Sequence, residues 1–187
     1  MESSSKAELR CHYRRVRREA MATAQAPMTG AALAALPLAL PLRVTPGRRL
    51  GLYWPIGAEP DLRAVADGLS AALPVVEGER LLYRPWQPGA PLAPDACGIP
   101  APPAGAGAAL EPEQLATLLV PALALDGQGI RLGSGGGWYD RLRADPAWRA
   151  VPALAVLPAA CLTPELPRDP WDVPFDGWLD DHGLHWL

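Results

Sequence analysis

The chain has 187 residues, 49% of them hydrophobic, and a formal net charge of −3 at pH 7. This length and apolar content favour one compact domain over residues 1–187, and the negative charge gives no electrostatic reason to expect nucleic-acid binding. The longest apolar run, 31–42, contains two prolines, is too short to span a bilayer and lies too far inside the chain for a signal peptide. We therefore expect a cytoplasmic monomer that binds neither membrane nor nucleic acid.

The first predicted element is a helix over residues 5–22. Its apolar residues recur at helical spacing, namely Leu9, Tyr13, Val16 and Ala20. The adjacent face carries the only lysine of the chain and three arginines, namely Lys6, Arg10, Arg14 and Arg17. Such a face is usually solvated, as on any amphipathic surface helix. The alternative is that it binds phosphate.

The middle of the chain alternates between helical and extended patterns. Residues 30–42 predict a second, irregular helical stretch, and 48–54 a strand that enters the sheet. From Asp61, a candidate N-cap, a helix is expected with an apolar face made by Leu62, Val65, Ala66, Leu69 and Leu73. Short strands follow at 74–76 and 81–86, and 88–107 is predicted to be a loop rich in Pro, Gly and Ala.

Two continuous apolar runs indicate strands that are covered on both faces. These are 118–125 and 151–157, and a short helix at 138–143 separates them. A Pro-rich C-terminal segment ends at 172–179. The alternation predicts an α/β fold, a three-layer α/β/α Rossmann-like single domain with a mostly parallel sheet. A ligand cleft is expected where the central strands end.

The densest motif is the glycine-rich segment 129–141, which follows the first buried strand. Gly133, Gly135, Gly136 and Gly137 can bring backbone N–H groups close together, as a phosphate-binding loop requires. Arg131 supplies a forked cation for phosphate oxygens, and Asp140 a hard oxygen ligand of the kind that Mg²⁺ prefers. Trp138 and Tyr139 offer flat surfaces for a heterocycle. Without these flanking residues, a flexible turn would explain the glycines equally well.

The motif resembles the hallmark of the 5-formyltetrahydrofolate cyclo-ligase family. That family carries a run like G-x-R-L-G-x-G-G-G-Y-Y-D-R, and this chain has Gly129-Ile-Arg-Leu-Gly-Ser-Gly-Gly-Gly-Trp-Tyr-Asp-Arg141. Three shorter matches occur in the family's order: Lys6-Ala-Glu-Leu-Arg10, Tyr53-Trp-Pro with Glu59-Pro-Asp61, and Asp172-Val-Pro-Phe-Asp176. The resemblance spans nearly the whole chain.

The resemblance implies an enzyme that uses ATP and Mg²⁺ to convert 5-formyltetrahydrofolate to 5,10-methenyltetrahydrofolate, releasing ADP and phosphate. Phosphorylation of the formyl oxygen would create an iminium phosphate that N10 attacks. Lys6 and Arg131 would act in catalysis on the ATP phosphates. The nucleotide site would comprise Lys6, Arg10, Arg131, Gly133, Ser134, Gly135, Gly136, Gly137, Trp138 and Tyr139. The folate would meet Trp54, Glu59 and Trp138, and the metal would be held by Asp140 and Asp176.

Departures from the family pattern keep other functions open. Ala116 and Thr117 stand where relatives often carry Asp, Trp138 replaces a Tyr, and Trp171 replaces a His. The alternatives are an ATP-dependent paralogue with another substrate, a nucleotide- or folate-binding module without turnover, and a loop that serves only as an interaction surface. Glu59 could also simply favour a helix N-terminus, and Asp172 and Asp176 could be ordinary turn carboxylates.

Other chemically versatile residues receive no functional role. The histidines His12, His182 and His185 show no partner pattern, and the cysteines Cys11, Cys97 and Cys161 lack metal spacing. We expect the cysteines to be structural, buried thiols in a reducing compartment. Trp171, Trp178 and Trp186 are expected to pack in the core or at the terminus.

Overall fold

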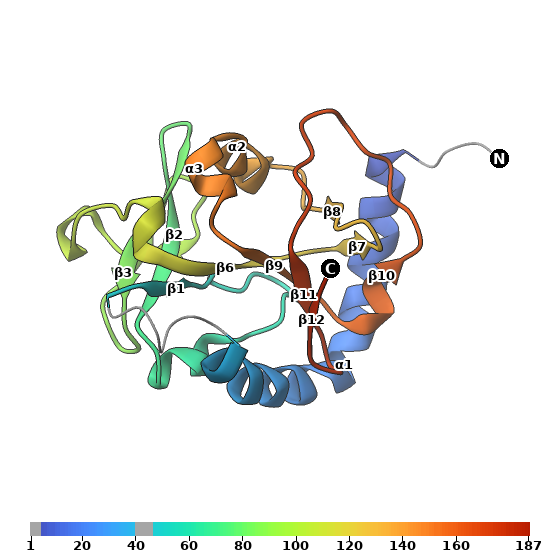
Figure 1. The fold of residues 1–187 in the computed structure, drawn as a ribbon, viewed down its shortest axis with the longest axis horizontal. Helices are drawn as coiled ribbons and strands as arrows, with labels where there is room; N and C mark the ends of the chain where they lie inside the picture. Colours follow the sequence, from blue (N-terminus) through green and yellow to red (C-terminus); the bar gives the residue numbers. More distant parts are fainter. Residues whose placement is uncertain (1–4, 40–46) are drawn as a thin grey trace.

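The computed structural model describes residues 5–39 and 47–187 and has at its centre a seven-stranded sheet (Figure 1). The strand order is β12-β11-β9-β6-β1-β2-β3, with antiparallel pairs at the two ends and parallel pairs between. The strands are β1 (Arg49–Gly51), β2 (Ala71–Glu77), β3 (Arg80–Trp86), β6 (Leu115–Pro121), β9 (Ala153–Val156), β11 (Gly177–Leu179) and β12 (Leu184–Trp186). Smaller sheets pair β7 (Ala124–Asp126) with β8 (Arg131–Leu132) and β10 (Leu162–Thr163), and β4 (Ala93–Pro94) with β5 (Pro100–Ala101).

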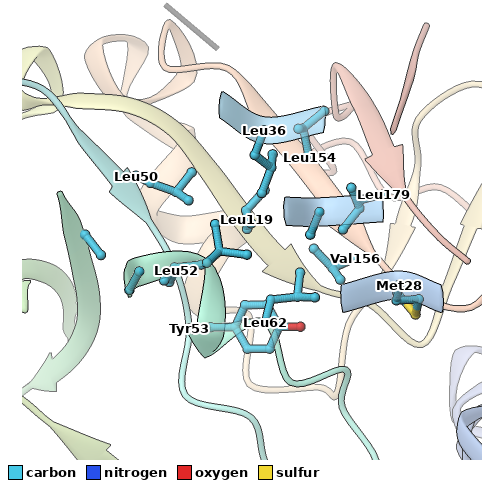
Figure 2. Close-up of a cluster of buried hydrophobic side chains, with 14 of the residues drawn as sticks. Met28, Leu36, Leu50, Leu52, Tyr53, Leu62, Leu119, Leu154, Val156 and Leu179 are labelled. Carbon is cyan, nitrogen blue, oxygen red and sulfur yellow. The ribbon is translucent and has the colours of Figure 1, made fainter. Parts of the chain in front are cut away.

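Helix α1 runs without interruption from Lys6 to Ala39. The two helical stretches predicted at 5–22 and 30–42 are therefore one helix as far as the description reaches, and residues 40–42 lie outside the described residues. Pro27 lies inside the helix, but buried residues at helical spacing, among them Met28 and Leu36, continue beyond it and pack on the sheet (Figure 2). Burial of this stripe offsets the cost of proline in a helix. Within the described ranges, no helix is long and apolar enough to cross a membrane.

The sheet is covered on both faces, which confirms the predicted α/β fold with three layers. On one face, α1 and the 3₁₀ helix η2 (Arg63–Asp67) bury Leu50, Leu119 and Leu154 (Figure 2). On the other face lie α2 (Trp138–Ala144) and α3 (Pro146–Arg149), over a cluster that includes Leu118 and Val120. Alternate residues of β6 thus face opposite layers, as its continuous apolar sequence requires. The shorter 3₁₀ helices are η3 (Ala104–Ala106), η4 (Pro112–Gln114) and η5 (Ala159–Cys161).

The structure corrects three local predictions. The helix expected from Asp61 is only the single 3₁₀ segment η2, because Leu73 belongs to β2, which pairs with both β1 and β3. The run 118–125 is divided between β6 and β7, which belong to different sheets. The C-terminal segment, predicted only as Pro-rich, contains the hairpin of β11 and β12. Short strands whose partners lie elsewhere in the chain leave little local signal.

The order of the strands places a crevice at the end of β1. From β1 the chain adds β2 on one side and then crosses to β6 on the other. In open α/β sheets, ligands bind at such a switch point, outside the carboxyl ends of the strands. Here those ends lead into Tyr53 and Trp54 after β1, and into Pro121 at the end of β6.

The pairing of β11 with β12 predicts that Gly177 tolerates no side chain. A Cβ atom at this position would lie 2.1 Å from the backbone oxygen of His185. Forcing the strands apart is expected to lower the free energy of unfolding by about 1–3 kcal/mol in Gly177→Ala, as measured by urea titration. Gly127→Ala is the matched control, because a Cβ atom there meets nothing within 4 Å. Equal stability of the two variants would contradict this account of the hairpin.

Candidate functional site

A cleft of about 370 Å³ opens at the predicted switch point. This volume is typical of small-molecule sites. The walls come from the start of α1, the segment after β1, strands β2 and β3, the glycine-rich loop and the segment before β11. The lining residues are Lys6, Arg10, Tyr53, Trp54, Ile56, Glu59, Pro74, Val76, Leu81, Asp95, Ile99, Pro121, Arg131, Leu132, Gly133, Ser134, Gly135, Gly136, Gly137, Trp138, Tyr139, Asp140, Asp169, Trp171 and Asp172. Every predicted site residue except Asp176 is in this set.

The glycine-rich loop connects β8 to α2 along one wall of the cleft. Gly135 has φ +113° and Gly137 has φ +65°, in the left-handed region that favours glycine. A Cβ atom at Gly133 would lie 2.8 Å from the Arg131 guanidinium, and one at Gly136 would lie 2.8 Å from the Trp138 indole. The glycines therefore provide both backbone conformation and close approach to cleft side chains.

The basic face of α1 packs against this loop: Arg17 is buried and Lys6 and Arg10 are half-buried, whereas Arg14 remains exposed. Lys6 and Arg10 line the cleft. Arg10 Nε donates to the Gly133 carbonyl oxygen at 3.1 Å, and Arg14 Nη2 donates to the Ser134 carbonyl oxygen at 3.0 Å. Two consecutive loop carbonyls are thus turned toward α1. Sequence periodicity identified this face, but it did not show what the face contacts.

Arg131 is nearly buried beside the loop, with 6% of its side chain exposed. Its Nη1 donates to the Pro121 carbonyl oxygen at 3.0 Å, while Nη2 lies 3.5 Å from Asp140 Oδ1. The guanidinium also lies 5.5 Å from the Tyr139 ring centroid. These contacts hold a fixed cation at the cleft, between the end of β6 and the start of α2.

Lys6 is held at the cleft entrance by two carboxylates from the C-terminal segment. Its Nζ lies 2.6 Å from Asp169 Oδ2 and 2.7 Å from Asp172 Oδ2. Partial burial acts to lower the pKa of Lys6, but the hydrogen bonds to the two carboxylates outweigh it and raise the pKa. The ammonium is therefore charged at neutral pH. No predicted motif includes Asp169, and the motif that includes Asp172 does not indicate Lys6 as its partner.

The cleft lining also includes a buried carboxylate, Glu59, and the aromatic side chains of Tyr53, Trp54 and Tyr139. Glu59 is 8% exposed, and its Oε2 accepts a hydrogen bond from the Ile56 N–H at 3.1 Å. Burial raises the pKa of Glu59, while the Ile56 N–H and the cation of Arg17 act to lower it. Trp54 lines the cleft, with the Arg63 guanidinium 4.1 Å from its ring centroid. A carboxylate beside an indole can receive N–H donors from a flat heterocycle.

The two predicted metal ligands lie in different surroundings. Asp140 lines the cleft next to Arg131. Asp176 is not among the cleft-lining residues, and its Oδ2 accepts from the Ala153 N–H at 2.8 Å and lies 3.4 Å from the Arg143 guanidinium. The structure thus does not bring Asp176 into the cleft beside Asp140. In the described part of the chain, no three His, Cys, Asp or Glu side chains gather as a metal cage.

Two residues outside the predicted site, Trp171 and Asp95, also line the cleft. Trp171 was expected to pack in the core or at the terminus, but it is 65% exposed and lines the cleft. Asp95, from the predicted loop 88–107, lines it too, and it accepts hydrogen bonds from the backbone of both Val76 and Ile99. A loop without periodicity gives no sign of such long-range contacts.

The cysteines and histidines are not among the residues that line the cleft. Cys161 is buried as expected, whereas Cys11 and Cys97 are exposed. His185 stacks on Trp178, with ring centroids 4.7 Å apart, and its Nε2 lies 3.1 Å from Asp180 Oδ1. That cluster belongs to the C-terminal hairpin.

The sequence of this chain is similar to those of known proteins. The sequence profile of the 5-formyltetrahydrofolate cyclo-ligase family matches residues 2–179. A 5-formyltetrahydrofolate cyclo-ligase from Mycolicibacterium smegmatis is 34% identical over 138 residues, which covers 68% of this chain and 70% of the relative. One of the same description from Haemophilus influenzae is 31% identical over 137 residues, covering 68% and 72%.

Solved structures extend the similarity to the fold. The NMR structure of a 5,10-methenyltetrahydrofolate synthetase from Aquifex aeolicus superposes with a TM-score of 0.72 at 28% identity, covering 97% of this chain and 92% of the other. A 5,10-methenyltetrahydrofolate synthetase from Mycoplasma pneumoniae gives a TM-score of 0.69 at 19% identity, covering 95% and 99%. At that lower identity, the likeness concerns the fold alone.

Proposed function

Because this chain belongs to the 5-formyltetrahydrofolate cyclo-ligase family, we propose that it converts 5-formyltetrahydrofolate to 5,10-methenyltetrahydrofolate at the expense of ATP. The observation that carries the proposal is the composition of one cleft. Its lining combines the cations Lys6, Arg10 and Arg131 and a glycine-rich loop with the buried carboxylate of Glu59 and the indole of Trp54. A phosphate chain and a pterin could therefore lie in it together.

ATP would bind at the end formed by α1 and the glycine-rich loop. Lys6, Arg10 and Arg131 all line this end and would contact phosphate oxygens, with Arg131 able to offer two parallel N–H groups. The loop residues 133–137 would add backbone N–H groups. Because phosphoryl transfer depends mainly on positioning and on neutralising charge, these cations would carry most of the catalysis.

The folate would bind at the Glu59 end. An ionised Glu59 can accept hydrogen bonds from the amino group and the ring N–H of a pterin. Trp54 and Trp138, which also line the cleft, would supply flat apolar contacts. This orientation would direct the formyl group toward the ATP phosphates.

Mg²⁺ fits the cleft with Asp140 as its protein ligand. Within residues 5–39 and 47–187, Asp140 Oδ2 has no hydrogen-bond partner, because the 3.5 Å contact with Arg131 involves Oδ1. Mg²⁺ is commonly held by one or two carboxylates together with substrate phosphates and waters, so a full protein cage is not required. Bound there, it would neutralise charge on the phosphates. Asp176 would not take part from its present position.

The proposed reaction has two steps, phosphorylation of the formyl oxygen and closure of the ring. The formyl oxygen of the folate attacks the γ-phosphorus, the bond to the β-phosphate oxygen breaks, and ADP leaves. The resulting iminium phosphate is attacked by N10 at the formyl carbon. N10 loses its proton, and inorganic phosphate departs as the C–O bond breaks. Activation by ATP is needed because the formyl oxygen alone is a poor leaving group.

Absorbance in the methenyl-folate band tests the proposal directly. The band should grow when the purified protein meets 5-formyltetrahydrofolate with Mg-ATP, and it should stay flat when either Mg²⁺ or ATP is omitted. If the band stays flat with all components, but Mg-ATP still raises the melting temperature, the protein is an ATP-using paralogue with another substrate. If neither change occurs, the nucleotide site itself is refuted.

Asp140→Asn should raise the Mg²⁺ concentration needed for half-maximal activity by roughly tenfold, as is typical of weakened metal sites. The reason is that the amide keeps the size of the side chain but removes the negative charge. Turnover measured over a series of Mg²⁺ concentrations gives the shift. Asp67→Asn, at an exposed position in η2, should leave the curve unchanged. An unchanged curve in Asp140→Asn would remove this residue from the metal site.

A further inference from the structure

Arg17 is a buried arginine that stands directly behind the cleft wall. It is 7% exposed and is not among the cleft-lining residues. Its Nη1 donates to the Ala122 carbonyl oxygen at 3.2 Å and lies 3.7 Å from Glu59 Oε1. It therefore contacts Glu59, the buried carboxylate among the described residues of the cleft lining, without lining the cleft itself.

Stability alone does not account for a charge at this place. Transfer of an ion pair from water into the interior costs about as much as the pair returns, and well-packed apolar side chains often serve equally well. Arg17 Nε is buried and has no hydrogen-bond partner among the described residues, so the guanidinium is only partly compensated. A buried and only partly compensated guanidinium is consistent with a positive charge that serves a function beside Glu59.

We propose that Arg17 is a positioning residue, which keeps Glu59 ionised and its carboxylate aimed so that it accepts the N–H donors of the reduced pterin. This inference rests on the proposed function and deepens it, since it assigns folate affinity to a residue that never touches folate. The same helix would thereby serve both ends of the cleft.

The surroundings of Glu59 set the sign of the expected pH effect. Arg17 from α1 and Arg131 from β8 are the cations that face it, and the phenols of Tyr53 and Tyr139 face it as well. Burial raises the pKa of Glu59, and both cations oppose that rise. Removal of Arg17 should therefore raise the pKa further, by about 1–3 pH units. Because the pterin requires the ionised form, affinity is lost as pH falls through this pKa.

The experiment measures equilibrium binding of 5-formyltetrahydrofolate without ATP across a pH series, followed by quenching of tryptophan fluorescence. Arg17→Gln is the first variant, since its amide can still donate to the Ala122 carbonyl. The pH at which folate affinity falls on acidification, the acid limb of the affinity profile, should be about 1–3 pH units higher than in the parent protein. Arg17→Lys restores the charge and should return the limb toward its original position. Arg15→Met, which removes an exposed arginine of the same helix, should change nothing.

Carboxyl protonation provides a second measurement that needs no ligand. The infrared difference spectrum between the parent protein and Glu59→Gln isolates the Glu59 carboxyl in the presence of Arg17. The difference spectrum between Arg17→Gln and the Arg17→Gln, Glu59→Gln double variant isolates it in the absence of Arg17. The carboxyl should titrate at a higher pH in the second spectrum than in the first. If Arg17→Gln does not fold, the same comparison is made with Arg17→Met. The proposal is overturned if the acid limb and the carboxyl titration both stay at the pH values of the parent protein. In that case a lowered melting temperature would mean that Arg17 contributes only to stability.

The two levels of proposal fail separately. Binding with the expected shift but without formation of the methenyl band would refute the cyclisation and leave the role of Arg17 intact. Formation of the band with no shift in Arg17→Gln would refute the role of Arg17 and leave the cyclisation intact. Absence of folate binding by the parent protein would overturn the role of Arg17 for pterin.

Discussion

Arg131→Met is expected to lower kcat/KM for ATP about 10³-fold, at the lower end of what an arginine contributes to phosphoryl transfer. The side chain is 6% exposed and is held by the Pro121 carbonyl and by Asp140. A preorganised cation of this kind needs no rearrangement as charge develops on the transferred phosphoryl group. Initial rates from the methenyl absorbance, measured over a range of ATP concentrations, give the value.

Two further variants separate catalysis from folding in this result. Arg131→Lys should restore little activity. A guanidinium can donate to the Pro121 carbonyl and to two phosphate oxygens at once, whereas the single nitrogen of an ammonium cannot reach all three. Arg15→Met, at an exposed position on α1, should retain the parent rate. A fall of less than tenfold in Arg131→Met, with the fold intact by circular dichroism, would show that the guanidinium does not meet the phosphates.

Lys6→Met is expected to lower kcat/KM for ATP about 10²-fold, as the loss of one well-placed donor commonly does. The ammonium lies at the cleft entrance between Asp169 and Asp172 and would exchange part of this contact for phosphate oxygens. Most of the effect should lie in KM for ATP, with a smaller one in KM for the folate. Steady-state rates with each substrate varied in turn check the division.

Asp169→Asn distinguishes a phosphate contact from a structural clamp. If Lys6 serves only to hold the C-terminal segment, this variant should lose activity as Lys6→Met does. If Lys6 contacts ATP, the ammonium is retained and is still paired with Asp172, so activity should stay near that of the parent. A matching loss in both variants would thus contradict the proposed role of Lys6.

The glycine-rich loop could be predicted because its signal is local. Residues 129–141 are contiguous, and the helix predicted at 138–143 is present as α2. Trp54 and Glu59 were assigned to the site through the resemblance, in the match Tyr53-Trp-Pro with Glu59-Pro-Asp61, and both line the cleft after the end of β1. Sequence patterns of this kind locate the carboxyl ends of strands, where α/β proteins place their ligands.

Contacts between distant segments could not be predicted in this way. The spacing of Arg14 and Arg17 identified a face of α1, but not that this face meets the loop and Glu59. The resemblance assigned Asp176 to the metal, yet here its carboxylate bonds to the Ala153 N–H at the start of β9. Trp171 is a large apolar residue of the kind that often packs in a core. It is exposed because the segment around it crosses the surface beside the cleft. Packing partners depend on tertiary structure, and periodicity carries no information about them.

The uninterrupted helix α1 fixes the distance between two residues of the proposed site, Lys6 and Arg17. Lys6 lines the cleft and Arg17 contacts the cleft residue Glu59, so a helical rise of 1.5 Å per residue fixes their separation along the helix axis at about 16 Å. One residue inserted between Arg10 and Arg17 would lengthen this span only slightly but would turn Arg17 by about 100° around the helix. The number of residues in this stretch is therefore under a stricter constraint than their identity. Natural relatives that keep the reaction should vary here by substitution, and not by insertion or deletion.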